Sequence, residues 1–394
     1  MRRFWLFAAA MMLWAGVAEA DPAAGGVYVI LNANDKSDWT NVAAAAKKDG
    51  VDGVLIHLTW NKISDGFMHY DFSALKAAIT QVVPTGKRFE IGIVTDGAVP
   101  SWVTDPSGLG AASAQFEVNA SVASGCQKLT VVPPYDDAYM EAFRDLLAKL
   151  SAYLHNQGYY DQLSMLKLSA LTTTTDELRL PARDTCPGAD PNANLKLWTT
   201  LDYTPAKVRS AWDGMLHAYA SRFPDKSFNI GFIGLNAFPG IRNNGTFPSD
   251  ADKQEALSES FLANLISDAG KILPGRVALG FDSLTLNPND ESYGISETEF
   301  LADAAQGGLR LGWQTNELFG QGANGGAACD GNSKKTAARC ATPADFHAML
   351  FSGIYPNGKG HATPATTAQY LELFEHDILE FPKVVQQADG NLVK

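Results

Sequence analysis

Eight short apolar runs, separated by stretches with helical periodicity, constrain this chain more than any other feature of its sequence. The runs are rich in β-branched residues and cover residues 26–31, 54–58, 88–94, 165–170, 228–234, 277–282, 309–314 and 369–374. Amphipathic helical patterns lie between them, for example at 139–155 and 206–222. Strands that alternate with helices along a chain form a parallel sheet with right-handed crossovers. The sequence therefore predicts an α/β protein with eight parallel strands.

The segment after the first predicted strand distinguishes a closed barrel from an open sheet. An open nucleotide-binding sheet carries a glycine-rich phosphate loop at this point, whereas this chain has Asn32-Ala33-Asn34-Asp35. We therefore predict a (β/α)8 TIM barrel with long βα loops, formed by residues 21–394 as a single domain. A bare barrel takes about 250 residues. Much of the excess follows predicted strands, at 96–135, 172–203 and 317–341.

The first twenty residues have the layout of a secretory signal peptide. Arg2 and Arg3 precede an apolar run at 4–17, and Ala18-Glu19-Ala20 is a small-x-small cleavage site. The apolar run is shorter than the roughly 20 residues that a membrane-spanning helix needs. We therefore expect cleavage after Ala20 and a secreted or periplasmic protein without a membrane span in the mature chain.

Export changes how the four cysteines are interpreted. An even number of cysteines in an oxidising compartment favours disulfides, and four cysteines allow three pairings. The preferred pairs are Cys126–Cys186, which joins two long loops, and Cys329–Cys340, which closes a short glycine-rich loop.

Composition limits the class of partner. The net charge of −12 argues against a nucleic acid or an anionic membrane surface and fits a neutral or cationic ligand. No cysteine spacing is typical of zinc, and the seven histidines form no HExxH motif. We expect no metal, no cofactor and a monomer.

Carboxylates, amides and tryptophans collect where the predicted strands end, which is where barrel proteins carry their functional residues. Paired carboxylates suit glycoside hydrolysis, because one protonates the leaving oxygen while the other attacks the anomeric carbon or activates water. Amides can bind sugar hydroxyls, and tryptophan faces can cover the apolar face of a sugar ring. The residues predicted to contact the sugar are Asn32, Trp60, Asp96, Trp102, Asp176, Asn236, Asp282, Trp313, Gln314, Asn316 and Glu372.

A motif after the second predicted strand resembles a clan of retaining (β/α)8 glycoside hydrolases that includes β-galactosidases and endo-glucanases. The matching residues are Trp60, Ile63, Gly66, Tyr70-Asp71-Phe72 and Leu75, followed by Pro100-Ser101-Trp102. The resemblance implies an acid/base Glu after the fourth strand and a nucleophilic Glu at the end of the seventh. By position these are Glu177 and Glu317.

The chain departs from the clan's pattern at one position. The clan usually has Asn before the acid/base, where its amide binds the sugar 2-hydroxyl, and here that residue is Asp176. An Asn-Glu pair occurs on the seventh strand instead, as Asn316-Glu317. Asp176 is thus a rival acid/base, and Glu372 is a rival carboxylate on the eighth strand.

These observations predict a secreted glycoside hydrolase that cleaves a poly- or oligosaccharide with retention. Among the aromatic residues, we expect Trp60 in the cleft, Trp313 stacked on the sugar, and Tyr70 and Phe72 in the core. Two other functions stay open: a carbohydrate-binding barrel without catalysis, and a lyase or transglycosylase that modifies an exopolysaccharide.

Overall fold

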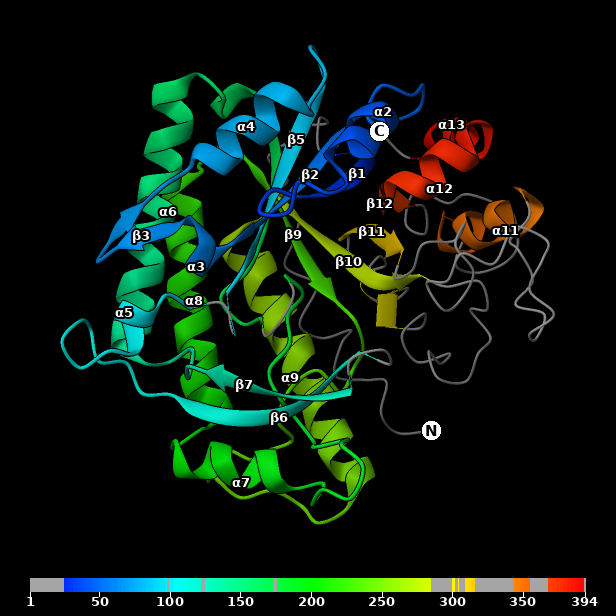
Figure 1. Ribbon diagram of the computed structural model, residues 1–394. Coiled ribbons are helices and arrows are strands. Elements are labelled where there is room, and N and C mark those ends of the chain that lie inside the picture. Colours follow the sequence, from blue (N-terminus) through cyan, green and yellow to red (C-terminus); the bar gives the residue numbers. More distant parts are fainter. Residues whose placement is uncertain are drawn as a thin grey trace.

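The computed structural model describes most of the chain (Figure 1). The described residues are 25–95, 97, 99–121, 125–172, 176–284, 300, 301, 304, 309–315, 343–354 and 368–392.

Eight parallel strands close into a barrel in these residues. They are β1 (Gly26–Asn32), β2 (Gly53–Thr59), β5 (Arg88–Val94), β8 (Leu163–Lys167), β9 (Ser227–Phe232), β10 (Val277–Leu284), β11 (Arg310–Thr315) and β12 (Ala368–Leu373). Each strand pairs in parallel with its neighbours, and β12 pairs with β1 to close the sheet. The predicted (β/α)8 barrel is therefore confirmed, and each predicted strand overlaps one strand of the barrel.

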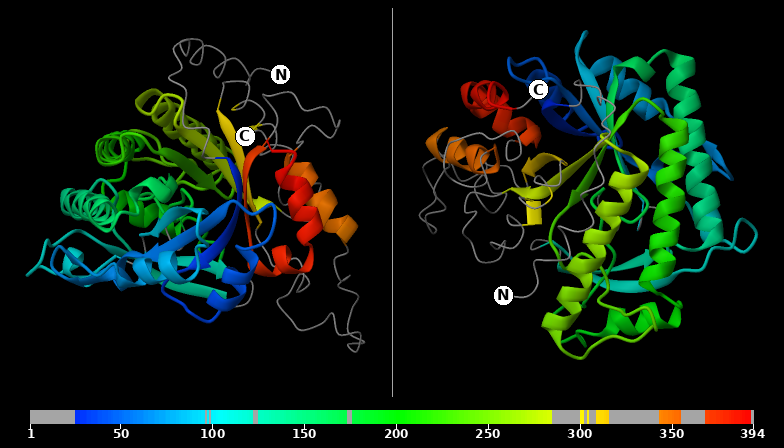
Figure 2. Two further views of the ribbon diagram at one scale, coloured as in Figure 1. Left: turned by 90° about the horizontal axis from the view of Figure 1, so that it is seen from above. Right: turned by 180° about the vertical axis from the view of Figure 1, so that it is seen from behind.

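Helices surround the barrel (Figure 2). The α-helices of the described residues are α2 (Trp39–Ala45), α3 (Trp60–Ile63), α4 (Ser73–Gln81), α5 (Ser101–Thr104), α6 (Asp137–Gln157), α7 (Ala193–Thr200), α8 (Pro205–Arg222), α9 (Ala251–Ile272), α11 (Pro343–Ile354), α12 (Glu375–Glu380) and α13 (Pro382–Asp389). Among the described residues, no helix is both long and apolar enough to cross a membrane.

Local capping explains where two of the long helices begin. The Thr204 hydroxyl accepts a hydrogen bond from the Lys207 amide, and Pro205 occupies the first turn of α8, where its missing N–H costs nothing. The Asp136 carboxylate accepts the amides of Ala138 and Tyr139 at the start of α6. Both helices then bury an apolar face against the barrel.

The two faces of the barrel strands differ in chemistry. Alternate strand residues point to opposite faces. The outward residues are apolar and join the main core, as Ile56, Ile91 and Leu279 do. The inward set includes charged residues, among them Glu90, Lys167 and Glu372, all of them buried. The charged lining of the barrel interior is what positions the candidate site.

Two hairpins were not predicted from the sequence. β3 (Ser64–Gly66) pairs with β4 (His69–Tyr70), and β6 (Ala114–Ser121) pairs with β7 (Gly125–Val131). The β6–β7 hairpin follows the third barrel strand and lies beside α7 at the lower end of the molecule in Figure 1. This end carries the loops that follow the strands.

Candidate active site

A cavity of about 600 Å³ lies at the carboxyl ends of the barrel strands. Its polar lining residues are Asn32, Asp35, Asp38, His57, Thr59, Asp176, Glu177, Gln314 and Glu375. Leu129 of β7 contributes to the wall, together with apolar residues of β1 and the segment after β12. The position matches the end of a barrel where enzymes of this fold place their reacting groups.

The segment that carries Asp176 and Glu177 is held against the barrel by its own backbone. The Leu178 amide donates to the Gly231 carbonyl at 2.8 Å, and the Arg179 amide donates to the Leu171 carbonyl at 2.7 Å. Asp176 is 2% exposed and Glu177 is 4% exposed. Both carboxyl groups therefore have fixed surroundings at the cavity wall.

Lys167 lies at the last position of β8, beneath the cavity, and is surrounded by acidic groups. Its Nζ atom is 2.8 Å from Glu372 Oε2, 3.1 Å from Asp282 Oδ2 and 3.3 Å from Asp176 Oδ2. It also donates to the Gln314 Oε1 atom at 2.9 Å. One buried ammonium thus joins the fourth, sixth, seventh and eighth strands of the barrel. We call Lys167 and these four partners the Lys167 cluster.

Burial and charge act in opposite directions on this cluster. Burial lowers the pKa of Lys167, but the carboxylates of Asp176, Asp282 and Glu372 outweigh burial and hold that pKa well above its ordinary value. Burial raises the pKa of Glu372 and, more strongly, that of Asp282, although Lys167 acts against both shifts. Lys167 therefore stays protonated, and three carboxyl groups together balance its positive charge.

Asp176 also pairs with His57 of β2. The His57 Nε2 atom is 3.1 Å from Asp176 Oδ2, the same oxygen that Lys167 approaches. Burial lowers the pKa of His57, but Asp176 more than reverses this and raises it above the ordinary value of 6.5. Burial raises the pKa of Asp176, while His57 and Lys167 together bring it well below the ordinary value. Asp176 is thus an anion that the Lys167 ammonium and the His57 imidazole stabilise.

This pair predicts a pH-dependent stability. A raised pKa on His57 means that its contribution is present below pH 6.5 and is lost as pH rises through the folded value. A lowered pKa on Asp176 means that its contribution is present above pH 3.8 and is lost as pH falls through the folded value. The substitution His57→Gln should therefore cost most near about pH 5 and less near about pH 9. Urea unfolding at both pH values measures this, and an equal cost at both would contradict it.

Four interior glycines make room for these groups. A Cβ atom on Gly92 would overlap the Asp176 carboxylate, and one on Gly231 would overlap the Asp282 carboxylate. Cβ atoms on Gly280 and Gly312 would overlap the Tyr370 side chain. Strands β5, β9, β10 and β11 each omit one side chain so that a larger polar one can lie inside the barrel.

Gly92→Ala should destabilise the fold by about 1–3 kcal/mol, because overpacking a filled interior forces side chains out of place. Gly66→Ala is the matched control, since its Cβ would meet only the His69 Cβ at 3.8 Å. Urea unfolding of both variants gives the comparison. Similar losses for the two variants would show that the space around Gly92 is not limiting.

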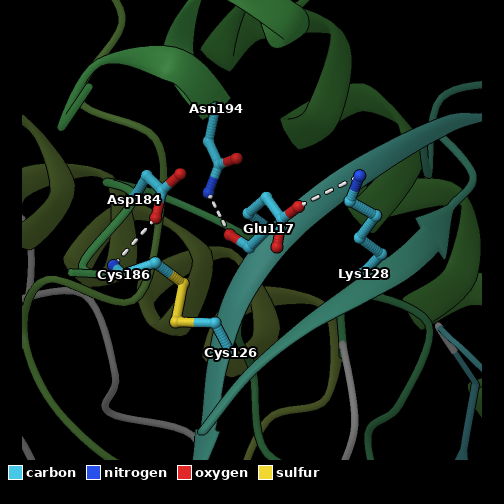
Figure 3. The surroundings of a disulfide bond; sticks show 6 residues. All are labelled: Glu117, Cys126, Lys128, Asp184, Cys186 and Asn194. Carbon is cyan, nitrogen blue, oxygen red and sulfur yellow. Dashed lines mark hydrogen bonds and ion pairs between the residues drawn. A yellow bond between two sulfur atoms is a disulfide. The ribbon is translucent and has the colours of Figure 1, made fainter. Parts of the chain in front are cut away.

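A disulfide braces the hairpin beside the cavity (Figure 3). Cys126 of β7 is bonded to Cys186, which lies in the loop that follows Glu177. The Cys186 amide donates to Asp184, and the Asn194 side chain of α7 donates to the Glu117 carbonyl of β6 at 2.8 Å. The predicted Cys126–Cys186 pair is confirmed, whereas Cys329 and Cys340 lie outside the described residues.

Replacing both cysteines of this bond with serine should lower the free energy of unfolding by about 2–4 kcal/mol. The bond links positions 60 residues apart, so its loss frees a long loop in the unfolded chain. Lys128→Ser on the same strand is the control, because it removes only an exposed ion pair with Glu117. Urea unfolding that shows equal effects for the two variants would contradict a bracing role.

The tryptophan predictions require correction. Trp60 is fully buried and packs edge-on against Tyr139 and Phe143, with ring centroids 5.6 and 5.5 Å away. Trp313 faces outward from β11 and packs against Phe281 in the apolar core. Neither residue lines the described cavity, so the predictions that Trp60 lies in the cleft and that Trp313 stacks on the sugar are wrong.

The prediction for Trp102 also requires correction, whereas those for Tyr70 and Phe72 agree with the structure. The indole of Trp102 donates to the Ser64 hydroxyl at 2.7 Å and lies against the β3–β4 hairpin, so Trp102 does not line the described cavity. Phe72 is buried, and the partly buried Tyr70 packs against the core. Both rings lie where they were predicted.

The polar residues predicted to bind sugar fall into three groups. Asn32, Asp176 and Gln314 line the cavity together with Glu177. Asp282 and Glu372 lie beneath it, bound to Lys167, and Asn236 is exposed and does not line it. The residues outside the described part of the chain are Asp96, Asn316 and Glu317.

Sequence reasoning missed the buried groups that hold the site together. Lys167 was not predicted, nor were Glu90 inside the barrel or Asn229, whose amide donates to Glu372 at 3.0 Å. A signal was present, because a lysine within the apolar run 165–168 is rare in a buried strand unless it is paired. Within the described residues, no three His, Cys, Asp or Glu side chains are arranged to hold a metal ion.

No protein-family model and no curated protein sequence matches the chain. Several solved structures are similar in fold. Xylanase 10B from Thermotoga maritima is 9% identical, with 90% of this chain and 84% of that chain covered and a TM-score of 0.47. Xylanase A from P fluorescens subsp. cellulosa, in complex with xylopentaose, is 9% identical, with 89% and 86% covered and a TM-score of 0.49. A glycoside hydrolase family 5 enzyme from Prevotella bryantii B14 is 11% identical, with 95% and 98% covered and a TM-score of 0.44. The fold assignment itself rests on the strand pairing of the closed barrel.

Proposed function

We propose that this protein is a glycoside hydrolase that cleaves a poly- or oligosaccharide with retention of configuration. The observation that carries the proposal is the place of Glu177, a nearly buried carboxyl group in the wall of a 600 Å³ cavity at the carboxyl ends of the strands. Glu177 is the proposed acid/base, and Glu317, two residues beyond β11, is the proposed nucleophile.

The proposed reaction has two steps. In the first, the Glu317 carboxylate attacks the anomeric carbon while the Glu177 carboxylic acid protonates the leaving oxygen. In the second, the Glu177 carboxylate takes a proton from water, and that water releases the sugar from Glu317. Asp176, held ionised by His57 and Lys167, provides a hydrogen-bond acceptor beside the reacting groups.

A hydrolysis screen tests this proposal. Soluble xylan, mannan, β-glucan and amino-sugar polymers are incubated with the parent protein and with the Glu177→Gln and Glu317→Gln variants. We expect one polymer class to be cleaved by the parent protein alone, with the product anomer matching the substrate anomer by NMR. Full activity in both variants, or an inverted product, would overturn the assigned roles.

Two outcomes of the same screen would favour the other functions. Binding of a polymer without cleavage, unchanged in both variants, would identify a carbohydrate-binding barrel. Unsaturated or transferred sugars among the products would identify a lyase or a transglycosylase.

We also propose export, with cleavage after Ala20. The disulfide between Cys126 and Cys186 supports this, because such bonds persist in oxidising compartments. The N-terminal residue of the purified mature protein, determined by mass spectrometry, tests it. Retention of residues 1–20 in the cytoplasm would contradict the proposal.

A further inference from the structure

The described lining of the cavity has an excess of negative charge. Five carboxyl groups line it, whereas His57 is the one basic side chain among the described lining residues. The five are Asp35, Asp38, Asp176, Glu177 and Glu375. They come from three separate parts of the chain, after β1, after β8 and after β12, so the cavity itself gathers them.

The cations near the cavity are already engaged. His57 pairs with Asp176 at 3.1 Å, and Lys167 lies beneath the cavity against three carboxyl groups. Asp35 and Asp38 are exposed at the rim, and neither forms an ion pair with a basic group of the described residues. A ligand that enters the cavity therefore meets the carboxylates of Asp35 and Asp38, which form no ion pair with the described part of the protein.

Glu375, which also lines the cavity, is a further carboxyl group in a negatively charged environment. Its carboxylate lies 3.2 Å from the His376 imidazole. Burial nevertheless raises the pKa of Glu375, and the nearby Asp38 carboxylate adds to the rise. A cation that binds between these two carboxylates would reduce the repulsion between them.

Gln314 is a second, independent sign of a ligand. It is 8% exposed, and its Oε1 atom is fixed by the hydrogen bond from Lys167. Its Nε2 group has no hydrogen-bond partner among the described residues, although the side chain lines the cavity. An amide donor on a side chain that lines the cavity can donate to an oxygen of a bound ligand.

We propose that the cavity binds a sugar unit that carries a protonated amine, as in a de-N-acetylated amino-sugar polymer. The ammonium would lie against Asp35, Asp38 and Glu375, and a ring or hydroxyl oxygen would accept from Gln314. A neutral sugar could accept from Gln314 but would leave Asp35 and Asp38 without a cation, and a uronic acid would be repelled by them. This proposal rests on the proposed function, because it takes the cavity to be the substrate site.

Binding of three matched oligosaccharides tests the inference. Hexamers of glucosamine, of N-acetylglucosamine and of glucose are titrated into the Glu177→Gln variant by calorimetry, so that turnover does not interfere. We expect the glucosamine hexamer to bind about tenfold or more tightly than the other two, and less tightly at high salt. We expect Asp35→Asn and Asp38→Asn each to weaken its binding about three- to fivefold. Asp252→Asn, an exposed change on α9 outside the cavity, should have no effect.

The outcomes separate this inference from the proposed function. Equal or weaker binding of the glucosamine hexamer, or no binding of any hexamer, overturns the inference. Cleavage of a neutral polymer by the parent protein would still leave the proposed function standing. Conversely, glucosamine binding that depends on Asp35 and Asp38, without cleavage of any polymer, supports the inference and overturns the hydrolase.

Discussion

Glu177→Gln is expected to lower kcat for polysaccharide cleavage by about 10²–10⁴-fold, the range that a positioned acid/base typically contributes. The amide keeps the size of the side chain and cannot give up a proton. Because Glu177 is nearly buried in a segment that the Gly231 and Leu171 carbonyls hold in place, the variant should keep its fold. Initial rates on the polymer identified in the screen, with the circular dichroism spectrum of the variant, measure this effect.

Two comparisons make the result specific to acid catalysis. An aryl glycoside has a leaving group that needs little protonation, so Glu177→Gln should slow its release much less than it slows polymer cleavage. Glu255→Gln on the exposed side of α9 should leave both rates unchanged. Equal losses on the two substrates would show that Glu177 acts in some way other than as the acid.

Lys167→Met should destabilise the protein by about 3–5 kcal/mol, because it leaves buried carboxyl groups without their cation. Lys167 is 1% exposed and lies within 3.3 Å of three carboxyl groups. Lys196→Met is the matched control, since Lys196 forms an exposed ion pair with Asp190, and such pairs contribute about 0–1 kcal/mol. The free energy of unfolding in urea measures both effects.

A double variant tests the reason for this loss. Lys167→Met combined with Glu372→Gln removes one of the carboxylates that the single variant leaves uncompensated, so part of the stability should return. If the two effects simply add, charge compensation does not explain the role of Lys167, and packing of its aliphatic chain becomes the better explanation.

The fold could be predicted because strands of a parallel barrel are buried on both faces, so their sequences contain apolar runs. The sequence did not predict in which direction individual side chains of a strand point. Trp313 and Gln314 are neighbours on β11, yet one packs in the outer core and the other lines the cavity. A shift of one residue in a strand reverses its faces, and no feature of the run 309–314 fixes that choice.

The candidate site was predicted only in part, for a related reason. Position after a strand indicated Asp176, Glu177 and Gln314, which the structure brings to one cavity. It could not indicate that Asp282 and Glu372 lie beneath the cavity, because that depends on Lys167, which comes from a strand on another side of the barrel. Pairing between distant strands is a three-dimensional property that spacing along the chain does not encode.

The glycines inside the barrel have a consequence for how such a protein can change. Gly92, Gly231, Gly280 and Gly312 leave the space that large polar side chains occupy, and Asp176 lines the cavity as well as filling that space. The interior is therefore both the structural centre of the protein and the support of its site. A substitution that fills this space with apolar atoms should strain the barrel and displace the groups at the cavity together. Stability and ligand recognition are therefore expected to change together. A change in one of them alone requires paired substitutions of a small residue and its polar neighbour.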